Sequence, residues 1–196
     1  MSPADAAFAE LGARLRGLPR RRSRADLRQA AVLVPLSWRD GELWVTLIRR
    51  PDTMSTHSGQ VACPGGRVDP GETSQEAALR ETHEELGLPG ERIELLGALH
   101  DVEVLVSRHV VTPWVGRIPA EAELIPNPLE VERVFSVPLS ALADAERSGF
   151  QLRQVSHHGR SYEVPAWTYA DEFIWGATGR MLLDLLRLLD RAPTPR

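Results

Sequence analysis

Between positions 66 and 88 the chain reads GRVDPGETSQEAALRETHEELGL, a glycine-containing turn that leads into a helix rich in glutamate. Glu81, Glu84 and Glu85 stand at positions i, i+3 and i+4, so their carboxylates project from one side of that helix. Like charges this close destabilise a helix unless positive charge lies between them. A hard divalent cation is the simplest candidate, because Mg²⁺ prefers oxygen ligands and usually joins carboxylates to substrate phosphates.

The same block resembles the Nudix box, a family motif written GX5EX7REUXEEXGU, in which U is an aliphatic residue. The positions in register are Gly66, Glu72, Arg80, Glu81, Glu84, Glu85, Gly87 and Leu88. Thr82 departs from the motif at the first U position, where its hydroxyl is expected to weaken packing beneath the helix. The resemblance implies an α/β fold, a Nudix-type α/β/α sandwich with a mixed β-sheet between helices. It also implies metal-assisted attack of water on a phosphorus atom of a nucleoside diphosphate that is linked to another group.

A plainer interpretation of this block is a solvated, charge-rich helix, since runs of glutamate on helices usually face water. We favour the motif, because a solvated helix needs neither glycines nor an arginine at fixed offsets. Arg80 has two interpretations as well. An ordinary surface arginine would pair loosely with Glu76 or Glu84, whereas in the family this arginine orients a glutamate of the box. The bidentate guanidinium suits the second use, which we favour.

The metal ligands that follow from the resemblance are oxygen donors. We expect Glu81 and Glu85 to bind Mg²⁺ or Mn²⁺, with Glu84 sharing a second ion or ordering its water. The carbonyl of Gly65 or Gly66 is expected to complete the coordination.

The catalytic groups are less fully determined. Glu72 is expected to orient the loop and Arg80 rather than bind metal. The general base is either Glu81, which we rank first, or Glu130, in the loop before VERVFSVP where many relatives supply a glutamate to the same metals. The expected catalytic set is therefore Glu81, Glu130, Arg80 and Glu84.

Composition places the chain among ordinary globular proteins, with 196 residues, 42% hydrophobic and 26% charged, and a formal charge of −4. We divide it into an N-terminal helix and arginine-rich segment, residues 1–27, and a single domain, residues 28–192. The negative charge argues against a nucleic-acid partner. No signal peptide or run of 18 apolar residues is found, so we expect a cytoplasmic protein with no membrane partner.

Two further features of composition each have a functional and a plain interpretation. Arginines crowd the N-terminal segment, at positions 14, 16, 20, 21, 22, 24 and 28. Such a run can contact nucleic acid, an anionic membrane or a phosphate-rich substrate, but we favour a solvated tail. Cys63, the only cysteine, cannot form an internal disulfide, and we expect a small buried hydrophobe rather than a catalytic thiol.

Hydrophobic periodicity predicts a mixed order of helices and strands without strict alternation. Thr73 and Glu76 are expected to form a capping box for the box helix, which Gly87 ends. The wide apolar stripe of the last helix is either a core face or also a homodimer contact. The other predicted helices cover 3–17, 139–147 and 174–190, and the predicted strands cover 30–36, 42–49, 93–104, 108–117, 131–139, 151–156 and 161–165.

Residues 47–66 resemble the signature of the coenzyme A pyrophosphatase branch of the family, roughly LLTXRSXXXRXXXGXXXFPGG. The glycines allow close backbone approach to a ligand, and Gln60 offers both a donor and an acceptor. His57 is a candidate contact for a substrate phosphate, with a structural hydrogen bond as its alternative. Ser55 and Cys63 depart from the signature. The expected substrate-binding residues are Arg50, His57, Gly59, Gln60, Gly65 and Gly66.

The resemblance to this branch spans about residues 30–190 and implies a nucleotide-type small molecule as the partner. The expected reaction is hydrolysis of coenzyme A or an acyl derivative to 4′-phosphopantetheine and adenosine 3′,5′-bisphosphate. A first alternative keeps the chemistry with another substrate, such as a dinucleotide polyphosphate, NADH, ADP-ribose or a damaged nucleoside triphosphate. A second is a non-catalytic Nudix-fold module that senses a nucleotide, against which the intact glutamates argue.

Overall fold

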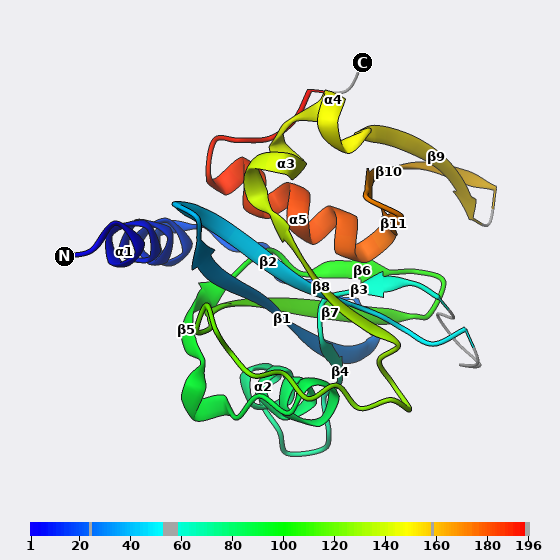
Figure 1. Ribbon diagram of the computed structural model, residues 1–196. Coiled ribbons are helices and arrows are strands. Elements are labelled where there is room, and N and C mark those ends of the chain that lie inside the picture. Colours follow the sequence, from blue (N-terminus) through cyan, green and yellow to red (C-terminus); the bar gives the residue numbers. More distant parts are fainter. Residues whose placement is uncertain (24, 53–58, 158, 195–196) are drawn as a thin grey trace.

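A mixed eight-stranded sheet forms the centre of the computed structural model, which describes residues 1–23, 25–52, 59–157 and 159–194 (Figure 1). Its strands are β1 (Arg28–Arg39), β2 (Glu42–Arg49), β3 (Val61–Ala62), β4 (Gly65–Arg67), β5 (Glu94–Ala98), β6 (Val102–Val104), β7 (His109–Arg117) and β8 (Arg133–Pro138). A smaller three-stranded sheet contains β9 (Gln151–His157), β10 (Arg160–Tyr169) and β11 (Glu172–Ile174). The helices are α1 (Pro3–Gly17), α2 (Ser74–Leu86), the 3₁₀ turn η1 (Gly90–Arg92), α3 (Leu139–Ala143), α4 (Ala145–Ser148) and α5 (Gly176–Leu188).

The larger sheet follows the order β3-β2-β1-β7-β5, with β4 beside β1, β6 beside β7 and β8 beside β2. The pairing of β1 with β7 is parallel, whereas β1 pairs antiparallel with β2 and with β4. Helix α2 lies on one side of the sheet and α3 and α5 lie on the other, while α1 sits at one end (Figure 1). This is the mixed α/β sandwich that the sequence predicts.

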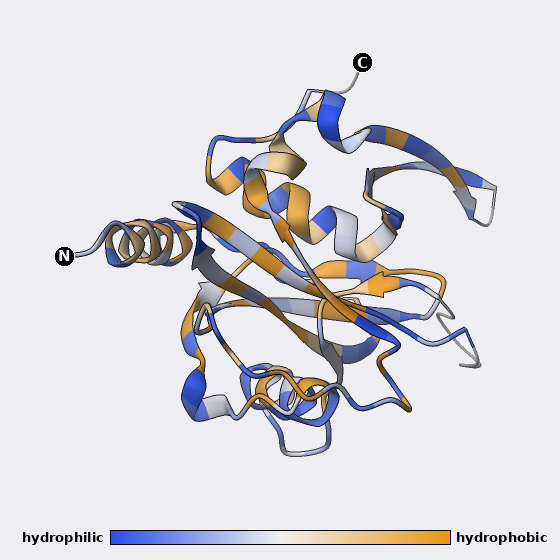
Figure 2. Ribbon diagram, viewed as in Figure 1, coloured by the Kyte–Doolittle hydropathy of each residue, from blue (hydrophilic) through white to orange (hydrophobic). Residues whose placement is uncertain are grey.

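Strand β1 is apolar on both of its faces because both are covered. Val34 and Leu36 join the large core beneath α1, α3 and α5, while Leu33 packs with Leu86 and Leu88 on the side of α2. Successive strand residues point to opposite faces, so one strand supplies both cores. Hydropathy colouring shows the contrast with the β9–β10 hairpin, which is largely hydrophilic (Figure 2).

The last helix contributes its apolar stripe to the large core, so the core interpretation is confirmed. Leu182, Leu185 and Leu186 are fully buried there, together with Trp167 of β10. The apolar stripe of α5 therefore packs against other elements of the same chain. None of the helices in the described part of the chain combines the length and the hydropathy that a membrane span requires.

The arginine-rich segment is docked at two of its side chains, so the solvated-tail interpretation is wrong there. Arg14 donates to the Leu188 carbonyl at 2.8 Å and pairs with Asp190 at 2.7 Å. Arg20 donates to the Leu99 carbonyl at 2.8 Å and pairs with Asp101. Arg14 thus ties α1 to the end of α5, and Arg20 ties the segment after α1 to the link between β5 and β6.

The same docking explains why the single strand predicted at 93–104 is two strands. Residues 99–101 hydrogen-bond to the N-terminal segment, as in the bond from the Asp101 amide to the Arg21 carbonyl at 3.0 Å. The predicted helix 139–147 is also divided, because the Asp144 carboxylate caps a new helix by accepting from the amides of Glu146 and Arg147. The short strands β3, β4 and β11 were not predicted.

We predict that Leu11→Ala destabilises the whole domain, because Leu11 of α1 is fully buried in the large core. The free energy of unfolding in urea should fall by about 2–5 kcal/mol, the usual cost of truncating a buried leucine. Glu10→Ala, on the exposed side of the same helix, is the matched control and should cost under about 1 kcal/mol. Equal effects of the two changes would show that α1 does not share the core.

Candidate active site

Helix α2 begins and ends as its sequence predicts. Thr73 and Glu76 form the expected capping box, and Gly87 ends the helix in the left-handed conformation at φ 65°. Thr82, the departure from the family motif, is fully buried, and its hydroxyl donates to the Ala78 carbonyl at 2.6 Å. The hydroxyl is therefore satisfied inside the helix instead of facing the core without a partner.

Two glycines of β4 allow close approach on two sides, Gly65 to strand β1 and Gly66 to helix α2. A Cβ on Gly65, whose φ is 152°, would lie 2.4 Å from the Ala31 carbonyl oxygen of β1. A Cβ on Gly66 would lie 2.3 Å from the carboxyl carbon of Glu81. The Glu81 carboxylate thus rests against bare backbone, which only glycine provides at this position.

Glu85 is a carboxylate buried beneath the helix, with 1% of its side chain exposed. The Gly65 amide donates to Oε2 at 2.8 Å, and Arg50 Nη2 donates to Oε1 at 3.0 Å and to the Gly65 carbonyl at 3.2 Å. Burial raises the pKa of Glu85 to about 7, even though Arg50 and the Gly65 amide lower it. One carboxylate therefore joins α2 to β4 and to the end of β2.

Arg80 connects the glutamates of the motif to one another. Its Nε donates to Glu72 at 2.8 Å, and its Nη1 donates to Glu81 at 3.0 Å and to Glu84 at 3.2 Å. Its Nη2 also donates to the Arg67 carbonyl at 3.0 Å. This set differs from the loose i,i+4 pair of a surface arginine and matches the interpretation in which Arg80 orients the carboxylates.

The electrostatics of Glu81 follow from partial burial among like charges. Its side chain is 16% exposed, and this burial raises its pKa, while Arg80 lowers it and Glu84 and Glu130 raise it further. Glu84 is more open, with 51% of its side chain exposed. Glu130 also raises the pKa of Glu85, so its charge acts on both buried carboxylates of the helix.

The loop before β8 brings Glu130 to the site by binding the end of α2. The amide of Ile125 donates to the Leu86 carbonyl at 2.8 Å, and the amide of Asn127 donates to the Glu85 carbonyl at 2.9 Å. The last carbonyls of a helix lack partners within it, so these bonds satisfy the end of α2. Sequence reasoning named Glu130 but missed Ile125 and Asn127, because backbone donors leave no signal in residue type.

The predicted substrate-binding residues are only partly brought together. The Gln60 carbonyl accepts from the Arg50 amide at 3.0 Å, and Gly59 has a φ of 64°. Arg50 holds Glu85 and Gly65, so its guanidinium serves the buried carboxylate in this structure. His57 and Ser55 lie outside the described residues. Cys63 is buried, and burial raises the pKa of its thiol to about 12, as expected of a small hydrophobe and not of a nucleophile.

The donor chemistry of the site fits a hard divalent cation. Glu81, Glu84, Glu85 and Glu130 offer only carboxylate oxygens, and Arg50 and Arg80 supply the counter-charge in this structure. In the described part of the chain, no three acidic, histidine or cysteine side chains already form a metal-binding cluster. The residues fit the ion by donor type and charge.

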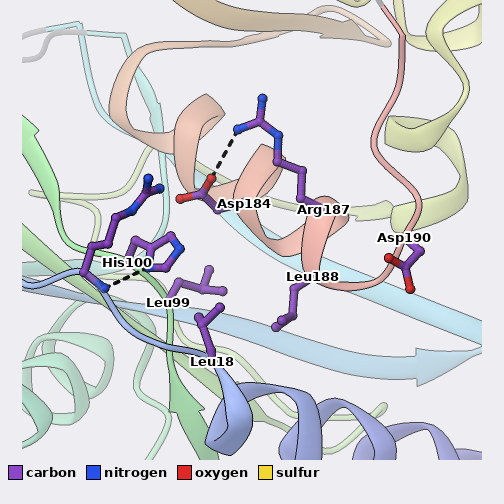
Figure 3. Close-up of a pocket in the computed structure, with 8 residues that line it drawn as sticks. Leu18, Leu99, His100, Asp184, Arg187, Leu188 and Asp190 are labelled. Carbon is purple, nitrogen blue, oxygen red and sulfur yellow. Dashed lines mark hydrogen bonds and ion pairs between the residues drawn. The ribbon is translucent and has the colours of Figure 1, made fainter.

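A cavity of about 380 Å³ lies away from this site, between the end of α1 and α5 (Figure 3). Its walls mix apolar side chains, such as Leu18 and Leu99, with His100, Asp184 and Arg187. Asp184 and Arg187 are 3.5 Å apart and face each other, as Figure 3 shows. None of the residues that line it belongs to the glutamate cluster on α2.

Comparison with known proteins places this arrangement in a family. The sequence profile of the NUDIX domain matches residues 27–158. The chain belongs to the Nudix family. It is 36% identical over 168 residues to the uncharacterized Nudix hydrolase NudL of Photorhabdus laumondii, covering 85% of this chain and 88% of that protein. Nudix hydrolase 3 of Caenorhabditis elegans is 36% identical over 190 residues, covering 88% of this chain and 78% of that protein.

The solved structure of a Nudix hydrolase from M. smegmatis, RenU, superposes with a TM-score of 0.51 at 26% identity, covering 59% of this chain and 73% of that chain. The Nudix fold expected from the sequence is therefore confirmed. The protein is a Nudix pyrophosphohydrolase, an enzyme acting on phosphorus-containing acid anhydrides. Enzymes of this family generally use divalent metal ions such as Mg²⁺ or Mn²⁺.

We predict that Gly66→Ala abolishes most of the activity without unfolding the protein, because the new Cβ displaces the Glu81 carboxylate. A displacement of about 1 Å at a catalytic group can lower kcat/KM by about a hundredfold. Steady-state hydrolysis and thermal unfolding should be measured on the same preparations. Gly17→Ala is the control, since a Cβ there meets nothing within 4 Å. Full activity of Gly66→Ala would contradict the close contact.

The raised pKa of Glu85 predicts that the metal-free protein loses stability as pH rises. The unfolded chain loses the Glu85 proton near 4.5, whereas the folded state keeps it to about 7. Between these values the folded state binds more protons, so the free energy of unfolding decreases with increasing pH. Urea unfolding in EDTA should show this decrease, and Glu85→Gln should reduce it. Identical pH dependence in the two proteins would contradict the prediction.

Proposed function

We propose that this enzyme hydrolyses a diphosphate bond in a nucleoside diphosphate-linked compound. The observation that carries the proposal is the contact of α2 with β4, where Glu85 is fixed on the Gly65 amide and Glu81 lies against Gly66. Carboxylates held this way stand in a fixed array on one side of the helix. The residues proposed to hold Mg²⁺ or Mn²⁺ are Glu81, Glu84, Glu85 and the Gly66 carbonyl.

The array suits a reaction in which negative phosphates must be bound and water must be deprotonated. A divalent cation would neutralise phosphate oxygens and lower the pKa of a water molecule. Arg80 keeps the carboxylates of Glu81 and Glu84 in place, because its guanidinium contacts both. Fixed catalytic groups lower the entropic part of the barrier.

The proposed general base is Glu81, with Glu130 as the alternative. Burial raises the pKa of Glu81, which makes it a stronger base than an exposed glutamate. Glu130 stands on the loop bound to the end of α2, within electrostatic reach of the same carboxylates. Either residue can accept a proton from water while the other keeps the site negative.

The substrate class we propose is broad: a dinucleotide polyphosphate, NADH, ADP-ribose or a damaged nucleoside triphosphate. Coenzyme A is the narrower candidate, and it is supported only by the resemblance of residues 47–66, within the wider span of about residues 30–190, to one branch of the family. Arg50 stands where the signature of that branch has an arginine. Its bonds to Glu85 and Gly65 give this arginine a role in the structure that does not require coenzyme A as the substrate. We therefore rank the broader class first.

The proposed location of the enzyme is the cytoplasm, and its proposed substrate is a small molecule. Cys63 is a free, buried thiol, which agrees with a reducing compartment. The proposed partner is the nucleotide-type substrate, with Gly59, Gln60 and His57 as candidate contacts.

A substrate panel with Mg²⁺ or Mn²⁺ tests the proposal. We expect metal-dependent release of a phosphorylated product from at least one compound among diadenosine tetraphosphate, NADH, ADP-ribose, 8-oxo-dGTP and coenzyme A. Preference for coenzyme A over the others would establish the narrower candidate instead. Absence of turnover on the whole panel with either metal would count against the proposal.

Two neutral replacements separate the candidate bases. Loss of the general base should lower kcat by about 10²- to 10⁴-fold, so either Glu81→Gln or Glu130→Gln should show that loss. Glu91→Gln, an exposed change in η1, is the control and should keep normal turnover. If Glu130→Gln turns over at the normal rate with normal metal affinity, Glu130 is excluded as the base.

A further inference from the structure

Asn127 is the residue that joins the helix of the active site to the turn carrying Glu130. Its backbone amide donates to the Glu85 carbonyl at 2.9 Å. Its own carbonyl accepts from the amides of Glu130 at 3.0 Å and Val131 at 2.8 Å. Its side-chain Oδ1 accepts from the Leu129 amide at 3.1 Å. One residue thus binds α2 on one side and closes the turn on the other.

The remainder of the turn is fixed by packing. Val131 is 3% exposed and belongs to the core cluster that contains Leu86 at the end of α2. Glu130 lies between this buried valine and Leu129, whose side chain is 81% exposed. The direction in which Glu130 leaves the backbone is therefore set by the conformation of residues 127–131.

The hydrogen bond made by the Asn127 side chain can be removed without removing the backbone bonds of this residue. An alanine at 127 keeps all three backbone bonds and loses only the acceptor for the Leu129 amide. That bond lies within the loop and does not reach the helix. Asparagine and aspartate commonly close turns by such a bond to a residue two positions on, whereas serine and threonine do so more weakly.

We propose that Asn127 is a positioning residue, which places the Glu130 carboxylate relative to Glu81 and Glu85 by closing the turn between residues 127 and 131. The inference rests on the proposed function, since it assigns to Glu130 a part in hydrolysis. Asn127 itself acts only through the turn.

The kinetic test compares Asn127→Ala, Asn127→Ser and Glu130→Gln on the best substrate of the panel. Asn127→Ala should lower kcat by about tenfold with KM within about twofold, because the turn shifts a catalytic group and leaves substrate binding intact. Asn127→Ser restores an uncharged acceptor and should recover part of the loss. Glu123→Ala, an exposed change on the same loop, should leave kcat unchanged.

The double variant Asn127→Ala with Glu130→Gln decides whether Asn127 acts through Glu130. If it does, adding Asn127→Ala to Glu130→Gln lowers kcat by less than about twofold, because coupled residues are not additive. A full tenfold further loss would overturn the inference, as would normal kcat in Asn127→Ala. Normal turnover of Glu130→Gln would also overturn it while leaving hydrolysis by the enzyme established.

Amide hydrogen exchange supplies a readout that does not depend on turnover. The amides of Leu129, Glu130 and Val131 should exchange faster in Asn127→Ala than in the wild type or in Glu123→Ala, since the turn has lost a bond. Unchanged exchange would overturn the inference. Faster exchange in a protein that hydrolyses nothing on the panel would mean that the turn is closed as described and that the proposed function has failed.

Discussion

The burial of the Glu85 carboxylate is the constraint on which the rest of the site depends. A charge removed from water is costly unless hydrogen bonds and an opposite charge compensate for it. Here the compensation comes from the Gly65 amide and from Arg50, which belong to different parts of the chain. Satisfying one carboxylate therefore fixes the distance between α2, β4 and the end of β2.

The other contacts of the site depend on that distance. Because α2 lies so close to β4, Glu81 meets the backbone at Gly66, and Arg80 reaches both the Arg67 carbonyl and the remaining glutamates. The end of the helix, in turn, presents the carbonyls to which the loop with Glu130 binds. A single buried ion pair thus organises a site whose other members are partly open to water.

Much of this could be predicted from the sequence, because the spacing of residues 66–88 encodes local geometry. Glu81, Glu84 and Glu85 share one side of the helix for reasons of periodicity alone, and Thr73 and Gly87 define its ends through their side-chain and backbone preferences. The sandwich followed from the order of apolar segments and from the family resemblance. These features are local, or repeat along the chain, so residue types reveal them.

What could not be predicted depends on contacts between distant segments. The break at residues 99–101 and the docking of Arg14 and Arg20 arise from partners about 80 or more positions away. The part played by Asn127 rests on backbone bonds, to which residue type gives no access. Arg50 was assigned to substrate from a motif, whereas its place beside Glu85 appears only when β2 and α2 are packed together.

The parallel pairing of β1 with β7 has a consequence for the order in which the chain acquires activity. β4, with both glycines of the site, is laid along β1 at residues 30–32, and the same residues pair with β7 at 111–113. Pairings between such distant segments form slowly, because a long loop must close before any contact compensates for its entropy. The glutamates are neighbours in sequence from the start, and Arg50, the partner of Glu85, is 35 positions away. The strand on which β4 lies, however, is held on its other side by β7, as in the pairing of Ala30 with Val111. We therefore expect a partly folded chain, in which β7 has not yet paired with β1, to carry the motif without the supported site.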